Sequence, residues 1–186
     1  MSPRQRTAGN SPAIYRWDQV VNDGPSPRSG RLKKGAPMSH SYVSNLMHCT
    51  FSTKDRYPFI DSNLKSRLFP YIGGIARENR MKALAIGGTN DHLHALLSLP
   101  GMMSFAKAVQ LIKGGSSKWL HEALPEYRKF EWREGYGAFS VSASQMPKTI
   151  AYINNQKEHH RRKTFQEEFL ELLKKHGIEY DARYVF

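Results

Sequence analysis

The sequence is poor in cysteine, in acidic residues and in long apolar runs. Its 186 residues include a single cysteine, Cys49, which excludes an internal disulfide framework and a cysteine-rich zinc site and is compatible with a reducing cytoplasm. No apolar run approaches the roughly 18 residues that a membrane span needs, so we expect a cytoplasmic protein without a membrane partner. A chain of this length suits one domain of ordinary size.

Acidic residues are clearly outnumbered by basic ones. The chain has 28 Lys+Arg against 16 Asp+Glu, a formal net charge of +12. A basic protein concentrates polyanions at its surface and gains affinity by releasing their counterions. The charge alone leaves nucleic acid, an anionic membrane surface and mere solubility open.

The first 37 residues differ from the rest in composition. Residues 1–37 hold seven Lys/Arg, two acidic residues and five of the ten prolines, with no sustained apolar periodicity. This composition predicts a basic, disordered N-terminal arm. A translation start at Met38 is the other interpretation. In both cases residues 38–186 form the folded domain.

From residue 41 onward the hydrophobic pattern alternates between strand and helix periods. The last long helix is expected to begin near Ser144, a suitable N-cap, with Pro147 in its first turn. The order β-α-β-β-α-β-α-α predicts an α+β, ferredoxin-like split βαβ fold, with a four-stranded antiparallel sheet, helices on one face and an additional C-terminal helix that carries a tyrosine. Strands are expected over 42–53, 81–88, 92–99 and 136–142, and helices over 62–79, 104–120, 144 to about 162, and 164 to about 175.

Two histidines, His92 and His94, stand two residues apart in an expected strand. Residues two apart on a strand point to the same face, so the two imidazoles lie side by side, roughly 6 to 7 Å apart at the backbone, which suits one divalent ion. Leu93 and Ala95 point to the opposite face, toward a core. Two ligands leave a metal site incomplete, and packing or surface histidines are the alternative interpretation.

Tyr152 and Gln156 are four residues apart on the expected last long helix and so share one of its faces. Tyrosine is a usable covalent nucleophile, and a glutamine carbonyl suits hard ions such as Mg²⁺ or Mn²⁺. A half-buried packing tyrosine beside a solvated glutamine is the alternative.

The two patterns together carry a family resemblance. His92-Leu93-His94 resembles the HUH motif of HUH endonucleases, and Tyr152-Ile153-Asn154-Asn155-Gln156 resembles their single nucleophilic tyrosine with its metal-binding glutamine. Segments 111–118, 132–142 and 176–181 are similar to parts of the single-tyrosine transposases of the smallest bacterial insertion sequences, the IS200-like family with its REP-associated relatives. The resemblance runs from about residue 39 to residue 186.

This resemblance implies cleavage and rejoining of single-stranded DNA at hairpin-bearing element ends. His92, His94 and Gln156 would hold one Mg²⁺ or Mn²⁺, and Tyr152 would attack the phosphorus to give a 5′-phosphotyrosine. It also implies a bacterial, nucleoid-associated homodimer, in which the tyrosine helix completes the metal site of its own chain or that of its partner. The sequence leaves both arrangements open.

Basic and aromatic residues between the two motifs are candidates for DNA binding, because cations contact the backbone and aromatic rings stack on unpaired bases. A surface with partly buried aromatics is the alternative. His160, four residues after Gln156, could be an extra ligand or a phosphate contact, but a solvated basic helix end, which the helix dipole stabilises, is the favoured interpretation. Asp91 could orient His92 or simply form a turn, Cys49 is expected in the core, and His48 has no assigned role. The DNA-binding candidates are Lys113, Lys118, Trp119, Arg128, Lys129, Trp132, Arg133 and His160.

Three other functions remain possible from the sequence. A domesticated transposase that processes chromosomal hairpin repeats would use the same chemistry. A ferredoxin-like module that binds nucleic acid without cutting it is the second, but the sequence has no clear aromatic ribonucleoprotein motif, which counts against this function. A hydrolytic two-histidine phosphodiesterase would need its histidine motifs on two strands, and only one such motif is present.

Overall fold

The computed structural model describes residues 42–185, so the predicted arm over residues 1–37 lies outside the described residues. A four-stranded sheet in the order β2-β3-β1-β4 organises the fold, and all three neighbouring pairs are antiparallel. This order confirms the predicted ferredoxin-like split βαβ topology. The strands are β1 (Leu46–Ser52), β2 (Lys82–Gly88), β3 (His92–Ser98) and β4 (Gly137–Val141).

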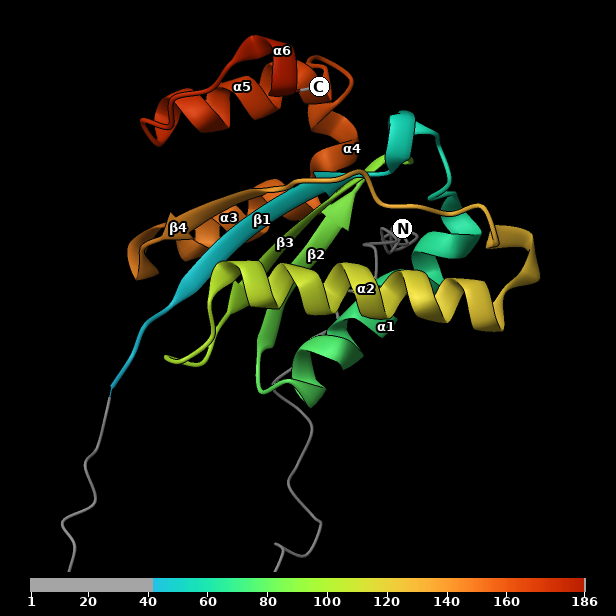
Figure 1. The fold of residues 1–186 in the computed structure, drawn as a ribbon. Helices are drawn as coiled ribbons and strands as arrows, with labels where there is room; N and C mark the ends of the chain where they lie inside the picture. Colours follow the sequence, from blue (N-terminus) through green and yellow to red (C-terminus); the bar gives the residue numbers. More distant parts are fainter. Residues whose placement is uncertain (1–41, 186) are drawn as a thin grey trace, which may run out of the picture. The chain divides into compact units, whose positions relative to one another are not determined.

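One face of the sheet is covered by α1 (Ser62–Glu78) and α2 (Phe105–Ala123) (Figure 1). Side chains that alternate along β1 and β3 pack against these helices in the main core, as a period of two requires. Both helices begin at side-chain caps, since Asp61 accepts a hydrogen bond from the Leu64 amide and Ser104 accepts one from the Lys107 amide. The core residues of the two central strands are Met47, Cys49, Phe51, Leu93, Ala95 and Leu97.

The other face carries the tyrosine helix α3 (Met146–Asn154) (Figure 1). Its Ile153 packs with Leu96 and Ala85 in a second, smaller core. The helix comes so close to β2 at Gly87 that a Cβ there would lie 2.1 Å from the Ile153 carbonyl oxygen. Gly87 is therefore required for this approach, which sets the height of Tyr152 above the sheet.

The predicted continuous helix from Ser144 to about residue 162 is wrong. Residues Ala143–Gln145 form a 3₁₀ turn, Gln145 is the N-cap, and Pro147 lies in the first turn of α3 as expected. The helix ends at Asn154, because Asn155 leaves helical geometry at φ −102° and ψ 19° before a single turn, α4 (Gln156–His159). Two consecutive asparagines have low helix propensity, which explains the break.

The remaining elements are short or lie after this break. β1 is shorter than the expected strand 42–53 because its first ladder partners are Ser98 and Val141, and Tyr42 before it is 93% exposed. Helix α5 (Phe165–Lys175) begins with a capping box between Thr164 and Glu167. The others are α6 (Ala182–Val185) and the 3₁₀ helices η2 (Lys54–Arg56), η3 (Pro125–Tyr127) and η4 (Ala143–Gln145).

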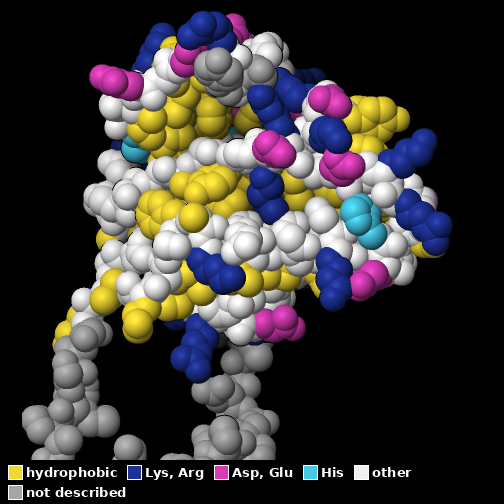
Figure 2. All heavy atoms as spheres, viewed as in Figure 1, with side chains coloured by type: hydrophobic (Ala, Val, Ile, Leu, Met, Phe, Trp, Pro, Cys, Tyr) yellow, Lys and Arg dark blue, Asp and Glu magenta, His cyan; other side chains and the backbone are white. Residues whose placement is uncertain are grey.

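The surface seen in Figure 2 mixes charges of both signs. Lys and Arg side chains are spread over this face with Asp and Glu between them, and they do not form one continuous basic patch. Within residues 42–185, no helix combines the length and the apolar character needed to cross a membrane.

Candidate active site

His92 and His94 lie on β3, on the sheet face opposite the main core, as predicted. They are 1% and 0% exposed. The carboxylate of Asp91 accepts a hydrogen bond from His92 Nδ1 at 2.7 Å, and Arg56 donates to the same carboxylate. Burial alone would raise the pKa of Asp91, but the hydrogen bonds from His92 and Arg56 outweigh burial and hold that pKa well below its usual range. Asp91 therefore orients His92 in addition to lying in the turn before β3.

His160 joins the two histidines across the face. Its Nδ1 donates to the Lys163 carbonyl at 2.9 Å, and its Nε2 lies 2.9 Å from His92 Nε2. Burial, together with the nearby His92, lowers the pKa of His160 to about 4, so the ring is neutral at pH 7. With the protons of both rings on Nδ1, two Nε2 lone pairs face each other.

Gln156 presents a third acceptor to the same point. Its side chain is 1% exposed, and Oε1 lies 2.9 Å from His160 Nε2. The amide nitrogen is committed elsewhere, because it donates to Glu168 at 3.1 Å. The side chains of Gln156 and His160 follow the helix break at Asn155, and both point toward the sheet, where His160 contacts His92 of β3.

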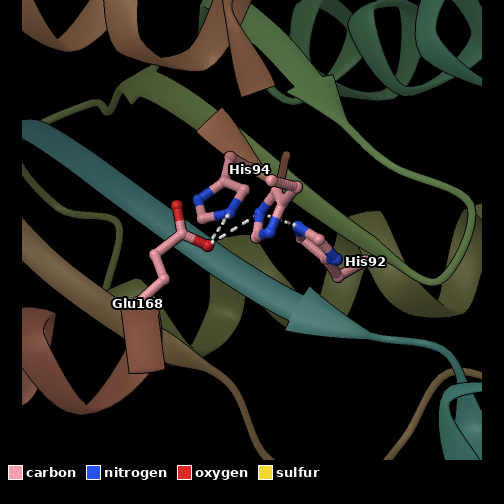
Figure 3. Close-up of side chains that lie close together, drawn as sticks. His92, His94 and Glu168 are labelled. Atoms are coloured by element: carbon pink, nitrogen blue, oxygen red, sulfur yellow. Dashed lines mark hydrogen bonds and ion pairs between the residues drawn. The ribbon is translucent and has the colours of Figure 1, made fainter. Parts of the chain in front are cut away.

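Glu168 on α5 completes the group, and it was not among the residues predicted for the site. Figure 3 shows Glu168 reaching from its helix toward His94 of β3. Its Oε2 lies 3.3 Å from His94 Nε2 and 3.1 Å from His160 Nε2, and is buried without a hydrogen bond. Burial raises the pKa of Glu168 to about 7. A signal was present in the sequence: Phe165, Glu168 and Leu172 follow helical spacing, which places an acid on an apolar face.

These side chains fit a divalent cation. The ligand atoms of His92, His94, His160 and Glu168 all lie within 4.8 Å of one another, and Gln156 Oε1 adjoins them. Neighbouring acceptors stand about 3 Å apart, which is the separation expected around an ion with bonds of about 2.0 to 2.2 Å. Acceptor atoms gathered this closely repel one another unless a proton or a cation lies among them.

Tyr152 stands beside this group in the same chain. Its hydroxyl donates a hydrogen bond to Glu168 Oε1, and its ring centroid is 5.8 Å from that of His94. Two hollows of about 850 Å³ each border the tyrosine. One includes Arg162 and Lys163 in its wall, and the other includes Lys148 and Lys175. The predicted metal ligands and the predicted nucleophile thus meet at one place, with open space on two sides.

The other DNA-binding candidates lie on the far side of the sheet or before β4. Lys113 donates to the carbonyls of residues 133 and 135, and Trp119 stacks on Tyr71 at 4.3 Å. Trp132 is 9% exposed and packs against two phenylalanines in the main core, so it has no open face for a base and is not carried into the proposal below. Lys118, Arg128 and Lys129 are exposed, and Arg133 is half-buried.

Fold and site together define the class: a split βαβ protein with a candidate metal centre and a tyrosine on one sheet face. Residues 41–156 match the family model described as transposase IS200 like. The chain belongs to this family, whose members cut DNA.

Individual relatives agree with this family. The ISDra2 transposase TnpA of Deinococcus radiodurans is 24% identical over 131 residues, 67% of this chain and 91% of the relative. A crystal structure of a protein assigned as a transposase from Deinococcus radiodurans R1 has a TM-score of 0.52 at 24% identity. The match covers 67% of this chain and 98% of that one. A REP-associated tyrosine transposase bound to a REP hairpin has a TM-score of 0.51 at 15% identity, covering 68% of this chain and 74% of that one. Both likenesses show the fold. The family match ends at Gln156, so His160 and Glu168 lie beyond it.

Proposed function

We propose that the protein is a metal-dependent transposase that cleaves and rejoins single-stranded DNA through a 5′-phosphotyrosine at Tyr152. The observation that carries this is the meeting of Tyr152 with a buried group of three histidines, Gln156 and Glu168 in one chain. A tyrosine hydroxyl held at a carboxylate beside a cation site is arranged for attack on a phosphodiester.

The cation would be held by His92, His94, Gln156, His160 and Glu168. When bound, it would polarise the scissile phosphate and stabilise charge on the leaving 3′ oxygen. Mg²⁺ and Mn²⁺ both suit the predicted chemistry, but three imidazole nitrogens favour Mn²⁺, since Mg²⁺ prefers oxygen ligands and retained waters.

The residues of this chain account for the rest of the step. Tyr152 Oη passes its proton to Glu168 Oε1 and bonds to phosphorus, while the bond from phosphorus to the 3′ oxygen breaks. The 3′ oxygen takes up the proton that Glu168 accepted, directly or through solvent, and leaves as a hydroxyl. The phosphotyrosine linkage conserves the energy of the broken phosphodiester bond, so a later 3′-hydroxyl can reseal the strand without ATP. The two hollows beside Tyr152 give the strand a path past the hydroxyl, lined by lysine and arginine.

We also propose a hairpin in single-stranded DNA as the substrate and a homodimer as the working form. The first is supported by the relative whose structure contains a REP hairpin. The homodimer follows from the family resemblance. In the single chain Tyr152 lies beside its own histidines, an arrangement compatible with a site assembled within one subunit.

A covalent trapping assay tests the proposal. Protein is incubated with Mn²⁺ and a hairpin-bearing single-stranded oligonucleotide taken from the DNA flanking its gene, then run on a denaturing gel. The wild type should form a DNA-protein adduct that is absent in Tyr152→Phe and in EDTA. Undiminished adduct in Tyr152→Phe would refute the nucleophile. Binding without any adduct would favour the non-catalytic nucleic-acid module.

A further inference from the structure

His48 lies directly behind one of the candidate metal ligands. It is on β1, opposite Leu96 of β3 and two residue pairs along from the Thr50 and His94 pair, so its side chain stands diagonally beside His94 on the same sheet face. His48 is 4% exposed, its ring stacks on that of His94 at 5.2 Å, and His48 Nε2 lies 3.0 Å from His94 Nδ1.

This contact fixes which nitrogen of His94 can bind a cation. His94 Nε2 is the atom that faces Glu168 and the rest of the group. A neutral imidazole carries one N–H, so a lone pair on Nε2 requires the proton on Nδ1. That proton then has one acceptor within hydrogen-bond distance among the described residues, the Nε2 lone pair of His48.

The two histidines of β3 are thus oriented in different ways. His92 donates its Nδ1 proton to Asp91, a carboxylate, whereas His94 donates to a neutral ring. Orienting groups behind ligating histidines are usually carboxylates or carbonyls. A neutral acceptor adds no negative charge behind His94, so the electrostatic potential on this side of the group stays more favourable for a negatively charged phosphodiester.

We propose that His48 is a positioning residue, which holds His94 in the tautomer and orientation that present Nε2 to the cation. The inference rests on the metal site of the proposed function. It assigns to His48 a role that the sequence did not suggest.

The test measures metal affinity without DNA. Mn²⁺ is titrated into full-length protein by isothermal titration calorimetry, with circular dichroism to confirm folding. His48→Phe keeps an aromatic ring but removes the acceptor, and Mn²⁺ affinity should fall by about 10- to 100-fold. His48→Gln can place an amide oxygen near the Nε2 position and should recover most of that loss. His121→Phe is the matched control, because it removes a histidine that contacts the Phe130 carbonyl of the main core, and it should bind Mn²⁺ as the wild type does.

The outcomes separate this inference from the proposed function. Wild-type affinity in His48→Phe would overturn the inference. Equal losses in His48→Phe and His48→Gln would also overturn it, because restoring an acceptor would then recover no Mn²⁺ affinity. Failure of the wild type itself to bind Mn²⁺ would refute the metal site, and the positioning role with it. Mn²⁺ binding by the wild type without any Tyr152 adduct would refute the nucleophile alone.

Discussion

Replacing Glu168 by glutamine should reduce the stabilisation that Mn²⁺ gives to the fold. The cation would join β3 to the segment that follows α3, through His92 and His94 on one side and Glu168 on the other. A ligand at about 100 times its Kd stabilises the native state by about 2.7 kcal/mol. At roughly 3 °C per kcal/mol for a domain of this size, the wild-type Tm should rise by about 8 °C.

The loss expected in Glu168→Gln follows from the same arithmetic. Affinity weaker by about 10- to 100-fold leaves about 0.4 to 1.4 kcal/mol of stabilisation at the same Mn²⁺ concentration, or a rise of roughly 1 to 4 °C. The metal-free Tm should stay the same or rise, because the variant no longer buries a carboxylate whose pKa is raised to about 7. A smaller Mn²⁺-induced rise in Tm together with an unchanged or higher metal-free Tm identifies Glu168 as a ligand, because loss of a residue that only packs would lower the metal-free Tm.

Differential scanning fluorimetry at pH 8, in EDTA and in Mn²⁺, measures both quantities. Glu171→Gln is the matched control, since it removes the same charge from an exposed position of α5 and should retain the wild-type Mn²⁺ shift. A full shift in Glu168→Gln, or an equal loss in Glu171→Gln, would refute the assignment of Glu168 as a ligand.

Three further predictions concern acid stability, the hollow beside the tyrosine and the packing of α3 on the sheet. The metal-free protein should lose stability as the pH falls below 6.5, because burial lowers the pKa of His48 to about 3 and that of His160 to about 4, and holds the pKa of His94 well below its ordinary value. Glu168, with its raised pKa, opposes them only in part, so Tm at pH 5 should lie below Tm at pH 7.5, and an equal or higher value would count against this. Lys175→Glu should weaken binding of a hairpin-free oligothymidylate in a fluorescence anisotropy titration, whereas Lys174→Glu, outside both hollows, should not; equal effects would point to net charge alone. Gly87→Ala should lower the free energy of unfolding by about 1 to 3 kcal/mol in a urea titration and reduce adduct formation, because its Cβ would collide with the backbone of α3; wild-type stability would show that α3 does not depend on this contact.

The sequence predicted the sheet well because its strands carry a clear period of two. The pattern over β3 placed Leu93 and Ala95 in the core and His92 and His94 on the other face, as the structure has them. The prediction was wrong at the last long helix, where the propensity of two asparagines outweighs the apolar periodicity that suggested continuity.

The site could be predicted only where its residues lie close together in the sequence. His92 with His94, and Tyr152 with Gln156, are local patterns. Glu168 reaches the group through the turn after α4, and its local signal is a single acid on an apolar helix face. His48 is hidden in a strand that is buried throughout, and only the register of β1 against β3 brings it to His94.

The position of the covalent bond to DNA tests the central claim most directly. Trypsin should release residues 149–157 as one peptide, between Lys148 and Lys157, and Tyr152 is its only tyrosine. After incubation with Mn²⁺ and the hairpin oligonucleotide, nuclease trimming, trypsin digestion and tandem mass spectrometry, the account predicts a nucleotide attached through its 5′ phosphate to Tyr152. An adduct on any other residue, or cleaved DNA with no adduct on this peptide, would contradict it.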